Sequence, residues 1–317
     1  MTTLYLAPIR GFTDTIYRNT FSEHFSGIDL AMAPFISTVC NFRIKPKHVR
    51  DLLPEQNRNL PVIPQILTND ADGFIRLACY LYELGYGTVN WNLGCPYPMV
   101  AKKKRGSGLL PFPDRIDEFL EKVLKAIPNK LSVKTRLGRF SADEIFELMP
   151  VFNRYPLEEL IIHPRTGVQM YEGVPDFDLF ESCLEMSTRP VVYNGDIFST
   201  DDFTRLKSRF KTIDKWMIGR GVLVDPFLPE TIAGTGLNTK PDRVAIIRRF
   251  HDDLFERYAE ILSGPSHLVQ KMKGTWGYLS RSFTNSRKFL KKIYKTKKLP
   301  QYQMVVDEFF SGDPQWE

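Results

Sequence analysis

The chain has few cysteines, no long apolar run and no glycine-rich dinucleotide motif, and each absence excludes a class of protein. Its four cysteines, Cys40, Cys79, Cys95 and Cys183, lie far apart and form no CxxC pair. This spacing argues against a structural zinc site and against the disulfide framework of a small secreted domain. No window approaches about 18 uninterrupted apolar residues, so no transmembrane helix is expected. The N-terminus shows no basic leader before an apolar run, and we therefore expect a cytoplasmic protein. From the cysteine spacing we expect no metal site.

Acidic residues are missing from one long stretch near the C-terminus. The segment 271–298 carries ten basic residues and no acidic one. Residues 240–317 together hold 15 Lys and Arg against 9 Asp and Glu, a net charge of +6 that equals the net charge of the whole chain. The rest of the chain is therefore neutral. A neutral body with a basic appendage predicts a polyanionic partner, and a solvated helix face without a partner is the alternative.

Eight short apolar runs, rich in β-branched residues, alternate with stretches of helical periodicity. Such runs are typical of buried parallel strands. They cover Leu4–Ala7, Leu30–Ala33, Val62–Ile66, Thr88–Asn92, Leu131–Thr135, Glu159–His163, Val191–Asn194 and Asp214–Ile218. The helices that we expect between them include Ala71–Leu84, Ile116–Ile127, one capped by Ser141 and Glu144, and Thr200–Phe210.

Eight β/α units within about 235 residues predict an α/β fold of the TIM (β/α)8 barrel type over residues 1–235. An open doubly wound sheet is the main alternative. The barrel is favoured because no Gly-x-Gly-x-x-Gly follows the first strand, and because polar residues follow many strands rather than one switch point. Residues 240–317 predict a small all-helical domain docked on the barrel, with helices near 242–262, 266–282, 285–294 and 299–310.

Polar residues at the ends of the predicted strands indicate a ligand site, because TIM barrels place their active sites at the C-terminal strand ends. These residues are Gln65, Asn90, Asn92, Cys95, Lys134, Arg136, His163, Arg165, Asn194, Asp196 and Arg220. Asn194-Gly195-Asp196 and Gly219-Arg220-Gly221 follow the last two strands, where barrels often bind phosphate. Each tripeptide alone is also compatible with an ordinary turn, but together they indicate a phosphorylated ligand.

Four of these residues also have ordinary explanations. Lys134 fits either an anionic ligand or a salt bridge at the barrel rim, and Gln65 fits either a planar heterocycle or a neighbouring loop. His163 is also compatible with a structural histidine. A lone cysteine is usually a small core residue, but Cys95 lies in a Gly-Cys-Pro turn just after a strand, which favours a thiol aimed into the site.

The motifs at the strand ends resemble those of tRNA-dihydrouridine synthases over nearly the whole chain. The resemblance rests on Ala7-Pro8-Ile9-Arg10-Gly11-Phe12-Thr13-Asp14, Gln65, Asn92-Leu93-Gly94-Cys95-Pro96, Lys134-Thr135-Arg136, His163-Pro164-Arg165-Thr166, Asn194-Gly195-Asp196-Ile197 and Gly219-Arg220-Gly221. The order and spacing of these motifs are specific. The length and the basic tail are most similar to those of the shorter bacterial members, including the tRNA-dihydrouridine(16) synthase branch.

The resemblance implies FMN as the cofactor, NADPH as the reductant and tRNA as the substrate. It implies that the isoalloxazine of the flavin meets Pro8, Ile9 and Gln65, that Arg10 also binds the cofactor, and that Lys134 stabilises the negative charge of reduced flavin. It assigns the ribityl phosphate to His163, Asn194, Gly195, Asp196, Gly219 and Arg220. It assigns the uracil or its phosphate to Asn92, Arg136 and Arg165. We expect a monomer.

The reaction implied by the resemblance is reduction of the C5=C6 bond of a D-loop uridine. Reduced FMN delivers hydride to C6, and Cys95 protonates C5 as a general acid. An unperturbed thiol has a pKa of roughly 8.5, so it keeps its proton at neutral pH.

Cations of the tail would hold the tRNA while the target base leaves its stack. They are Lys271, Lys273, Arg281, Arg287, Lys288 and Lys291. The run Lys102–Arg105 is either a further RNA contact or a solvated loop. The aromatic residues between the tail charges are Tyr278, Phe283, Phe289 and Tyr294. They are expected in the core of the helical domain, and stacking platforms for bases are the alternative.

The chain departs from the family pattern at Ile9, Asn90 and Pro164, where the family usually has Met, Asp and Gly. The glycine-rich loop that follows the cysteine appears here as Lys102–Gly108. These departures leave open which uridine is modified. Two other functions are compatible with the sequence: an FMN-dependent dehydrogenase of a free pyrimidine or another small molecule, and a non-catalytic tRNA-binding protein on the same scaffold. A yellow protein that also binds tRNA would distinguish the synthase from both.

Overall fold

The computed structural model describes residues 2–38, 49–235 and 243–317. Within them, parallel strands form one ten-stranded sheet in the order β3-β5-β6-β7-β8-β9-β10-β1-β2-β4. The strands are β1 (Thr3–Leu6), β2 (Leu30–Met32), β3 (Ile36–Ser37), β4 (Val62–Ile63), β5 (Gln65–Leu67), β6 (Thr88–Asn92), β7 (Lys130–Gly138), β8 (Leu160–Thr166), β9 (Val191–Asn194) and β10 (Lys215–Ile218). Cys40 and the predicted boundary residues 236–242 lie outside the described residues.

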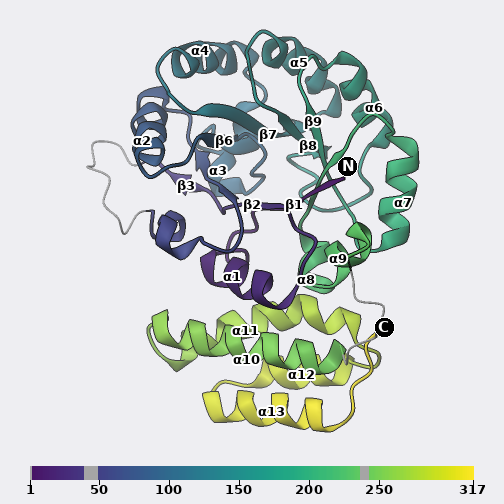
Figure 1. Ribbon diagram of the computed structural model, residues 1–317. Coiled ribbons are helices and arrows are strands. Elements are labelled where there is room, and N and C mark those ends of the chain that lie inside the picture. Colours follow the sequence, from purple (N-terminus) through teal and green to yellow (C-terminus); the bar gives the residue numbers. More distant parts are fainter. Residues whose placement is uncertain (1, 39–48, 236–242) are drawn as a thin grey trace.

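The two ends of this strand order, β3 and β4, close the sheet into a barrel. β3 continues the segment of β2, and β4 continues into β5, so the same two chain segments pair at both ends of the order. Pro64 has no N–H to give to a ladder, and it divides the third predicted strand into β4 and β5. β4 pairs with β2, and β5 pairs with β3, a short continuation of the second strand that the sequence does not predict. With the divided segments joined, the eight predicted strands are those of the barrel. The TIM-barrel prediction is confirmed, and Figure 1 shows the helices arranged around the strands.

The helices that surround the barrel are α1 (Thr15–His24), α2 (Ala71–Glu83), α3 (Pro98–Ala101), α4 (Pro113–Leu124), α5 (Ile145–Asn153), α6 (Phe177–Met186), α7 (Thr200–Arg209), α8 (Arg220–Val224) and α9 (Leu228–Ala233). The four barrel helices predicted from the sequence are present as α2, α4, α5 and α7, and the described part of the chain has five more around the barrel that the prediction does not include. The capping box predicted at Ser141 and Glu144 is present, but it opens a 3₁₀ turn, η5 (Ala142–Glu144), that leads into α5. Short 3₁₀ turns also cover Arg50–Leu52, Pro54–Gln56 and Gly106–Leu109.

Successive side chains of a strand point to opposite faces of the sheet, and the buried apolar side chains therefore form two separate clusters. Leu4 and Leu6 of β1 face the helices and belong to the large outer core. Tyr5 and Ala7 point the other way, into the barrel, where they meet a small inner cluster. The inner cluster is completed by Met32, Ile161, Val192 and Met217. Because this cluster fills the barrel interior, the inward-facing side chains at the strand ends lie above it and are free to form a site.

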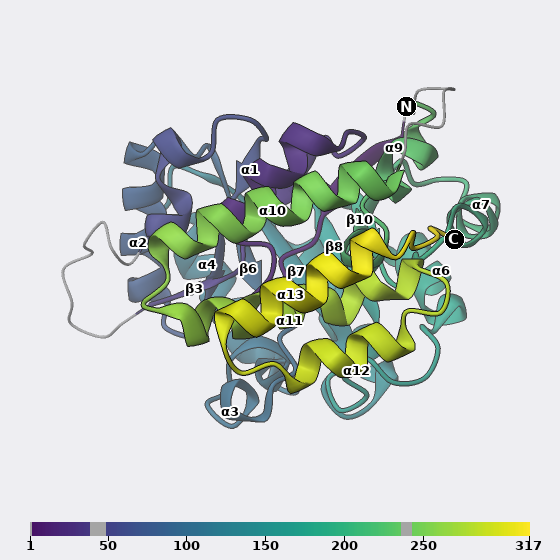
Figure 2. The same ribbon diagram turned by 90° about the horizontal axis from the view of Figure 1, so that it is seen from below.

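The C-terminal residues form a helical layer on one side of the barrel (Figure 2). It consists of α10 (Arg243–Ile261), α11 (Pro265–Leu279), the 3₁₀ turn η6 (Ser280–Ser282), α12 (Arg287–Lys295) and α13 (Leu299–Ser311). Its core is built on buried Trp276, whose ring centroid lies 4.7 Å from that of Phe289 and whose Nε1 donates to Tyr302 Oη at 2.9 Å. The predicted all-helical appendage is therefore present. None of the described helices is both long and apolar enough to cross a membrane.

The helical layer docks on the segment that joins β1 to α1. Asp14 caps α1 by accepting from Tyr17 N at 3.1 Å. The same carboxylate accepts from Tyr258 Oη of α10 and from Lys271 Nζ of α11, each at 2.7 Å. Phe12 packs edge-on against Tyr278 of α11, with ring centroids 5.1 Å apart. The loop that leads from the first strand toward the predicted site is therefore held by both parts of the molecule.

Candidate active site

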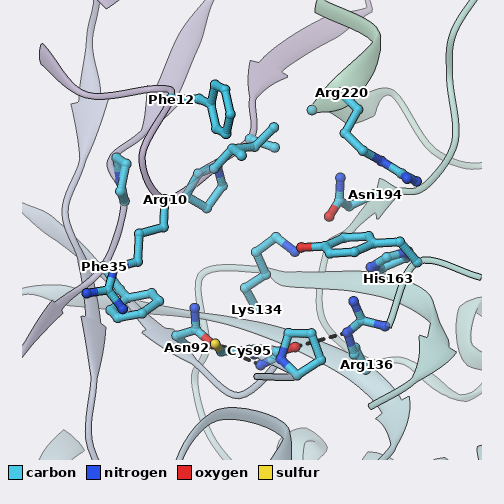
Figure 3. Close-up of a pocket in the computed structure, with 18 of the residues that line it drawn as sticks. Arg10, Phe12, Phe35, Asn92, Cys95, Lys134, Arg136, His163, Asn194 and Arg220 are labelled. Atoms are coloured by element: carbon cyan, nitrogen blue, oxygen red, sulfur yellow. Dashed lines mark hydrogen bonds between the residues drawn. The ribbon is translucent and has the colours of Figure 1, made fainter. Parts of the chain in front are cut away.

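A cavity of about 240 Å³ opens at the C-terminal ends of the barrel strands (Figure 3). It brings together many of the residues predicted from the strand ends. Of these, the lining includes Pro8, Ile9, Arg10, Asn92, Cys95, Lys134, Arg136, His163, Asn194, Gly195, Asp196, Gly219 and Arg220. Three predicted strand-end residues, Gln65, Asn90 and Arg165, are fully or almost fully buried and are not part of this lining.

The loop after β1 is fixed by one buried hydroxyl. Thr13 Oγ1 accepts from Ile9 N at 2.8 Å and donates to Ala7 O at 3.2 Å. Fully buried Arg18 donates to Thr13 O at 2.8 Å and pairs with Asp51 at 3.0 Å. A local turn and a buried ion pair therefore hold Ile9 at the wall of the cavity.

A chain of carboxamides lies under the floor of the cavity. Asn90 Nδ2 donates to Ser132 Oγ at 2.8 Å, and Asn90 Oδ1 accepts from Gln65 Nε2 at 2.8 Å. Gln65 Oε1 then accepts from Asn92 Nδ2 at 2.7 Å. The two asparagines lie on the same side of β6, as their alternate positions predict. Gln65, predicted to meet the flavin, instead has its amide engaged with these side chains.

The carboxamide chain ends on the turn that carries the thiol. Asn92 Oδ1 accepts from Cys95 N at 2.8 Å and from Gly94 N at 3.1 Å. Ser107 N and Oγ both donate to Cys95 O, at 3.1 and 3.0 Å. Gly106 lies against the same residue with φ +55°, and a Cβ there would come within 2.8 Å of the Cys95 Cβ. Cys95 is therefore positioned from two sides, by the end of β6 and by the turn at Gly106 and Ser107.

Cys95 is a buried thiol that keeps its proton. Its residue is 7% exposed, and burial raises the pKa of the thiol above its usual value. The charges of Arg136, Arg10 and Lys134 act in the opposite direction but do not cancel the effect of burial. The site therefore contains a proton donor whose conjugate thiolate would be surrounded by cations.

Lys134 and Arg136 enter the cavity from β7. Burial and the charge of Arg136 lower the pKa of Lys134 to about 7. The Lys134 ammonium makes no hydrogen bond within the described part of the chain, and Figure 3 shows it reaching the middle of the cavity. Arg136 donates from Nε to Gly94 O at 2.9 Å and from Nη1 to Thr166 O at 2.8 Å, which leaves its Nη2 for the cavity. Burial lowers the pKa of Arg136 to about 10.

One carboxylate organises the cations at the opposite wall. Asp196 accepts from Nη1 and Nη2 of Arg165 at 3.0 and 2.6 Å, and from Arg220 Nη2 at 2.6 Å. Burial alone would raise the pKa of Asp196, but the hydrogen bonds and charges of the two arginines hold it below its usual value. Two guanidinium groups against one carboxylate leave a net positive charge for an anionic ligand.

Arg165 has no donor left for RNA. Its Nε donates to Glu172 O, and its two Nη atoms donate to His163, Asp196 and Gly173. A guanidinium has five N–H groups, so all of them are used. In this structure Arg165 positions its neighbours, and the predicted contact with the uracil or its phosphate would require one of these hydrogen bonds to be exchanged. Because Arg165 can only donate, His163 Nε2 accepts and His163 Nδ1 carries the proton.

His163 is neutral, since burial and the surrounding cations lower its pKa well below the usual range. Beside it, the backbone N–H groups of Gly195 and Asp196 have no hydrogen-bond partner within the described residues. A Cβ on Gly219 would come within 3.3 Å of the Ala7 Cβ and 3.4 Å of Ile9 Cδ1. Glycine at this position therefore allows the end of β10 to pack closely against the loop after β1.

Tyr171 is a residue of the site that the sequence prediction omits. It lines the cavity with its ring between two arginines, 5.4 Å from Arg136 Cζ and 4.8 Å from Arg220 Cζ. It lies in the loop after β8, where no strand or turn pattern marks it. Phe35 and Tyr278 also line the cavity from other loops and from α11. An aromatic residue shortly after a predicted strand end is the only sequence signal that would have found Tyr171.

The cations predicted to bind RNA fall into two groups. Lys271 is tied to Asp14 and to Gly11 O, and Lys273 is 6% exposed with its ammonium donating to backbone carbonyls of Tyr294 and Thr296. Lys271 therefore ties the helical layer to the barrel and Lys273 stabilises the layer internally, so both ammonium groups have structural partners in place of the phosphates predicted for them. Exposed cations remain at Arg281, Arg287, Lys288 and Lys291.

Of the four aromatic residues predicted in the core of the helical domain, two are buried there and two are not. Phe283 and Phe289 are core residues, as expected. Tyr278 reaches the cavity, and Tyr294 is 53% exposed, so both differ from the prediction. Within the described residues no cluster of three His, Cys, Asp or Glu side chains suitable for a metal is present.

Comparison with known protein families shows what this chain is similar to. The model of the family described as dihydrouridine synthase (Dus) matches residues 5–309. The tRNA-dihydrouridine synthase B of Pasteurella multocida is 29% identical over 226 residues, which cover 71% of this chain and 67% of that protein. The tRNA-dihydrouridine(16) synthase of Pseudomonas putida is 28% identical over 292 residues, which cover 88% of each chain.

Solved structures share the barrel at low identity. Morphinone reductase aligns with a TM-score of 0.54 and 11% identity over 76% of this chain and 88% of its own. The old yellow enzyme homologue from Zymomonas mobilis aligns with a TM-score of 0.54 and 11% identity over 76% of this chain and 91% of its own. At this identity the likeness concerns the fold alone.

Proposed function

This chain belongs to the dihydrouridine synthase family, and we propose that it reduces the C5=C6 bond of a uridine in the D-loop of tRNA, with FMN as its cofactor and NADPH as the reductant. One observation carries the proposal. A single cavity holds a buried, protonated thiol (Cys95), an ammonium without a partner in the described chain (Lys134) and a cationic wall at Arg220. An acid, a charge stabiliser and an anion site are the groups that flavin-dependent reduction of an enone-like base requires.

The residues around the cavity fit FMN. The phosphate would be held by Arg220, by the free backbone N–H groups of Gly195 and Asp196, and by the Nδ1–H of neutral His163. The apolar wall at Pro8 and Ile9 suits the ring system, and the Lys134 ammonium suits the negative charge of the reduced ring. When bound, reduced FMN supplies the hydride that is added to C6 of the uracil.

The side chains of this chain perform the proton step. Cys95 donates its proton to C5, and the hydride and proton together complete the two-hydrogen reduction. The cations that lower the pKa of Cys95 (Arg136, Arg10 and Lys134) stabilise the thiolate left behind until solvent reprotonates it. Asn92 keeps one amide N–H free beside its bond to Gln65, and Arg136 keeps Nη2 free. These donors would orient the uracil carbonyl groups.

The tRNA contact is proposed for the exposed face of the helical layer. Arg281, Arg287, Lys288 and Lys291 carry charges that neither dock the layer nor fill its core. A base reaches a barrel mouth only after leaving its stack, so phosphate contacts around the mouth would stabilise the complex while the base is extruded.

The test uses purified protein reduced anaerobically and then mixed with unmodified tRNA in a single turnover. We expect a yellow protein that NADPH bleaches, with dihydrouridine formed as the colour returns. Cys95→Ala should slow dihydrouridine formation by about 10²–10⁴-fold, the usual contribution of a general acid. Cys79→Ala, which removes a free thiol on α2, is the matched control and should react at the wild-type rate.

Undiminished product with Cys95→Ala would remove the acid role from the mechanism. A colourless protein that binds tRNA would overturn the proposed reaction itself. Mapping the dihydrouridine in the product tRNA identifies the uridine that is reduced.

A further inference from the structure

A second groove opens beside the active-site cavity and shares two of its residues. It has a volume of about 340 Å³. Its lining consists of Arg10, Phe35, Ser37, Leu67, Met99, Val100, Lys103 and Arg105. Arg10 and Phe35 also line the cavity that contains Cys95. We call this feature the side groove. Three of its lining residues are cationic and none is acidic, so its charge matches an anion.

The cations of the side groove are not used by the described part of the protein. Arg10 forms no hydrogen bond or ion pair there, and its guanidinium rests 5.4 Å from the centre of the Phe35 ring. The Lys103 ammonium has no described partner. Arg105 donates only from its Nε, to Asn69 Oδ1 at 3.2 Å, and its two Nη groups make no hydrogen bond within the described residues. Cations that the fold leaves unpaired at a groove are available to a ligand.

The loop that carries Lys103 and Arg105 is held in one conformation by hydrogen bonds. Asn69 Nδ2 donates to Lys103 O at 3.1 Å while its Oδ1 accepts from Arg105, so one side chain ties both ends of the turn. Between them Lys104 adopts a left-handed φ of +51° and lays its ammonium 4.5 Å from the centre of the Phe112 ring. Lys103 and Arg105 are therefore held on the groove side and Lys104 away from it.

The side groove is separate from the cationic wall assigned above to the FMN phosphate. Figure 3 shows Arg10 and Phe35 on one side of the cavity and Asn194 and Arg220 on the other, with Cys95 and Lys134 between them. Asp196 accompanies the cations of the Arg220 wall, whereas none of the described residues that line the side groove carries a carboxylate. Two positive clusters on opposite sides of the reacting groups are suited to two separate anionic groups.

We propose that the side groove binds a backbone phosphodiester of the tRNA next to the reacting uridine. The inference rests on the proposed function and adds a subsite to it. One wall of the side groove is formed by α3 and the loop after it, and α3 starts three residues after Cys95. Met99 of α3 is 80% exposed. An apolar side chain beside three cations suits a ribose or base next to its phosphate. Figure 2 also shows α3 and the basic helix α12 toward the same side of the molecule, α3 on the barrel and α12 in the helical layer (Figure 1), so a polyanion as long as tRNA would reach both.

The experiment compares two charge reversals in the same loop. Lys103→Glu places a carboxylate in the side groove, and Lys102→Glu makes the same change at an exposed neighbour that does not line it. Binding of fluorescently labelled, unmodified tRNA is measured by anisotropy at several salt concentrations, with thermal melting as the check on folding. We expect Lys103→Glu to weaken binding about tenfold and to reduce the salt slope by about 1. Lys102→Glu should change binding less than about twofold, and Lys103→Arg should restore it.

The nicotinamide reductant is another source of phosphate, and a second measurement separates it from RNA. The rate at which NADPH reduces the bound flavin without tRNA should be the same for Lys103→Glu and the wild type. Slower reduction with unchanged tRNA binding would overturn the proposal and give the groove to NADPH. Equal effects of Lys103→Glu and Lys102→Glu on tRNA binding would also overturn it. A wild type that makes no dihydrouridine but binds tRNA in a Lys103-dependent manner would refute the proposed function and retain the subsite.

Discussion

At the scale of single residues, the charge of Lys134 is set by its place in the cavity. Burial and Arg136 lower its pKa from 10.5 to about 7, while the unfolded chain keeps the ordinary value. The unfolded state therefore binds more protons between these two values. It follows that the charged lysine destabilises the protein without ligand below about pH 7, and that this cost disappears as the pH rises toward 10.5.

The first prediction concerns Lys134→Met in protein stripped of ligand. The variant should be more stable than the wild type at pH 6, and the difference should shrink steadily between pH 7 and 10. Urea unfolding at a series of pH values measures it. Lys125→Met, an exposed control on the surface of the barrel, should show no such trend. A difference for Lys134→Met that does not vary with pH would contradict the lowered pKa.

A second prediction belongs to Asp196, which pairs with fully buried Arg165. Asp196→Asn keeps the shape of the side chain and removes its charge. Because the carboxylate is partly exposed, we expect a loss of about 2–3 kcal/mol in the free energy of unfolding, in the range for hydrogen bonds to charged groups. The pKa of Asp196 lies below its unfolded value of 3.8, so the stabilisation is present above that pH and lost as the pH falls through the folded pKa.

Urea unfolding at pH 7 measures the effect of Asp196→Asn. Glu147→Gln, an exposed substitution on α5, is the control and should cost less than about 0.5 kcal/mol. Equal stabilities of the two variants would mean that Arg165 does not depend on this carboxylate.

At the scale of elements, the site is assembled where loops press on one another. Gly106 begins the 3₁₀ turn Gly106–Leu109 and packs against the backbone of Cys95. Gly106→Ala should cost about 1–3 kcal/mol, from the left-handed φ and from the overlap with Cys95. Gly85→Ala is a matched control, since Gly85 also has a positive φ but nothing lies within 4 Å of its added Cβ.

Dihydrouridine formation separates these two glycine variants. Both should lose stability, but only Gly106→Ala should shift Cys95 and lower the rate of product formation, by about tenfold or more. The rate at which iodoacetamide alkylates Cys95 in the native protein reports the same displacement. Equal rates of product formation in the two variants would show that the turn does not position the thiol.

At the scale of the whole molecule, the positive charge gathers on one helix of the added layer. Replacing Arg287, Lys288 and Lys291 of α12 by Gln should weaken tRNA binding and reduce its salt slope by about 2–3. The control replaces Lys122, Lys125 and Lys130, three exposed lysines on the barrel, by Gln. It makes the same change in net charge and should leave the slope near the wild-type value. Equal slopes would mean that net charge alone drives binding.

Much of the fold follows from local sequence. Buried parallel strands require short apolar runs, and eight such runs can be recognised in the sequence, from Leu4–Ala7 to Asp214–Ile218. Residues at strand ends are placed by the same pattern, which is why Cys95, Lys134 and Arg220 are found together in one cavity. The break at Pro64 and the short strand β3 escape the pattern, because they depend on how the sheet closes.

What a polar side chain does is decided by partners far along the chain. The sequence by itself predicts the basic tail, the barrel and the motif around Cys95. Only the tertiary structure shows that Lys271 meets Asp14, that Lys273 is buried, and that Arg165 has spent all of its donors. The physical reason is that apolar periodicity is a local property of the chain. Hydrogen bonds and ion pairs, in contrast, form between segments that only the folded chain brings together.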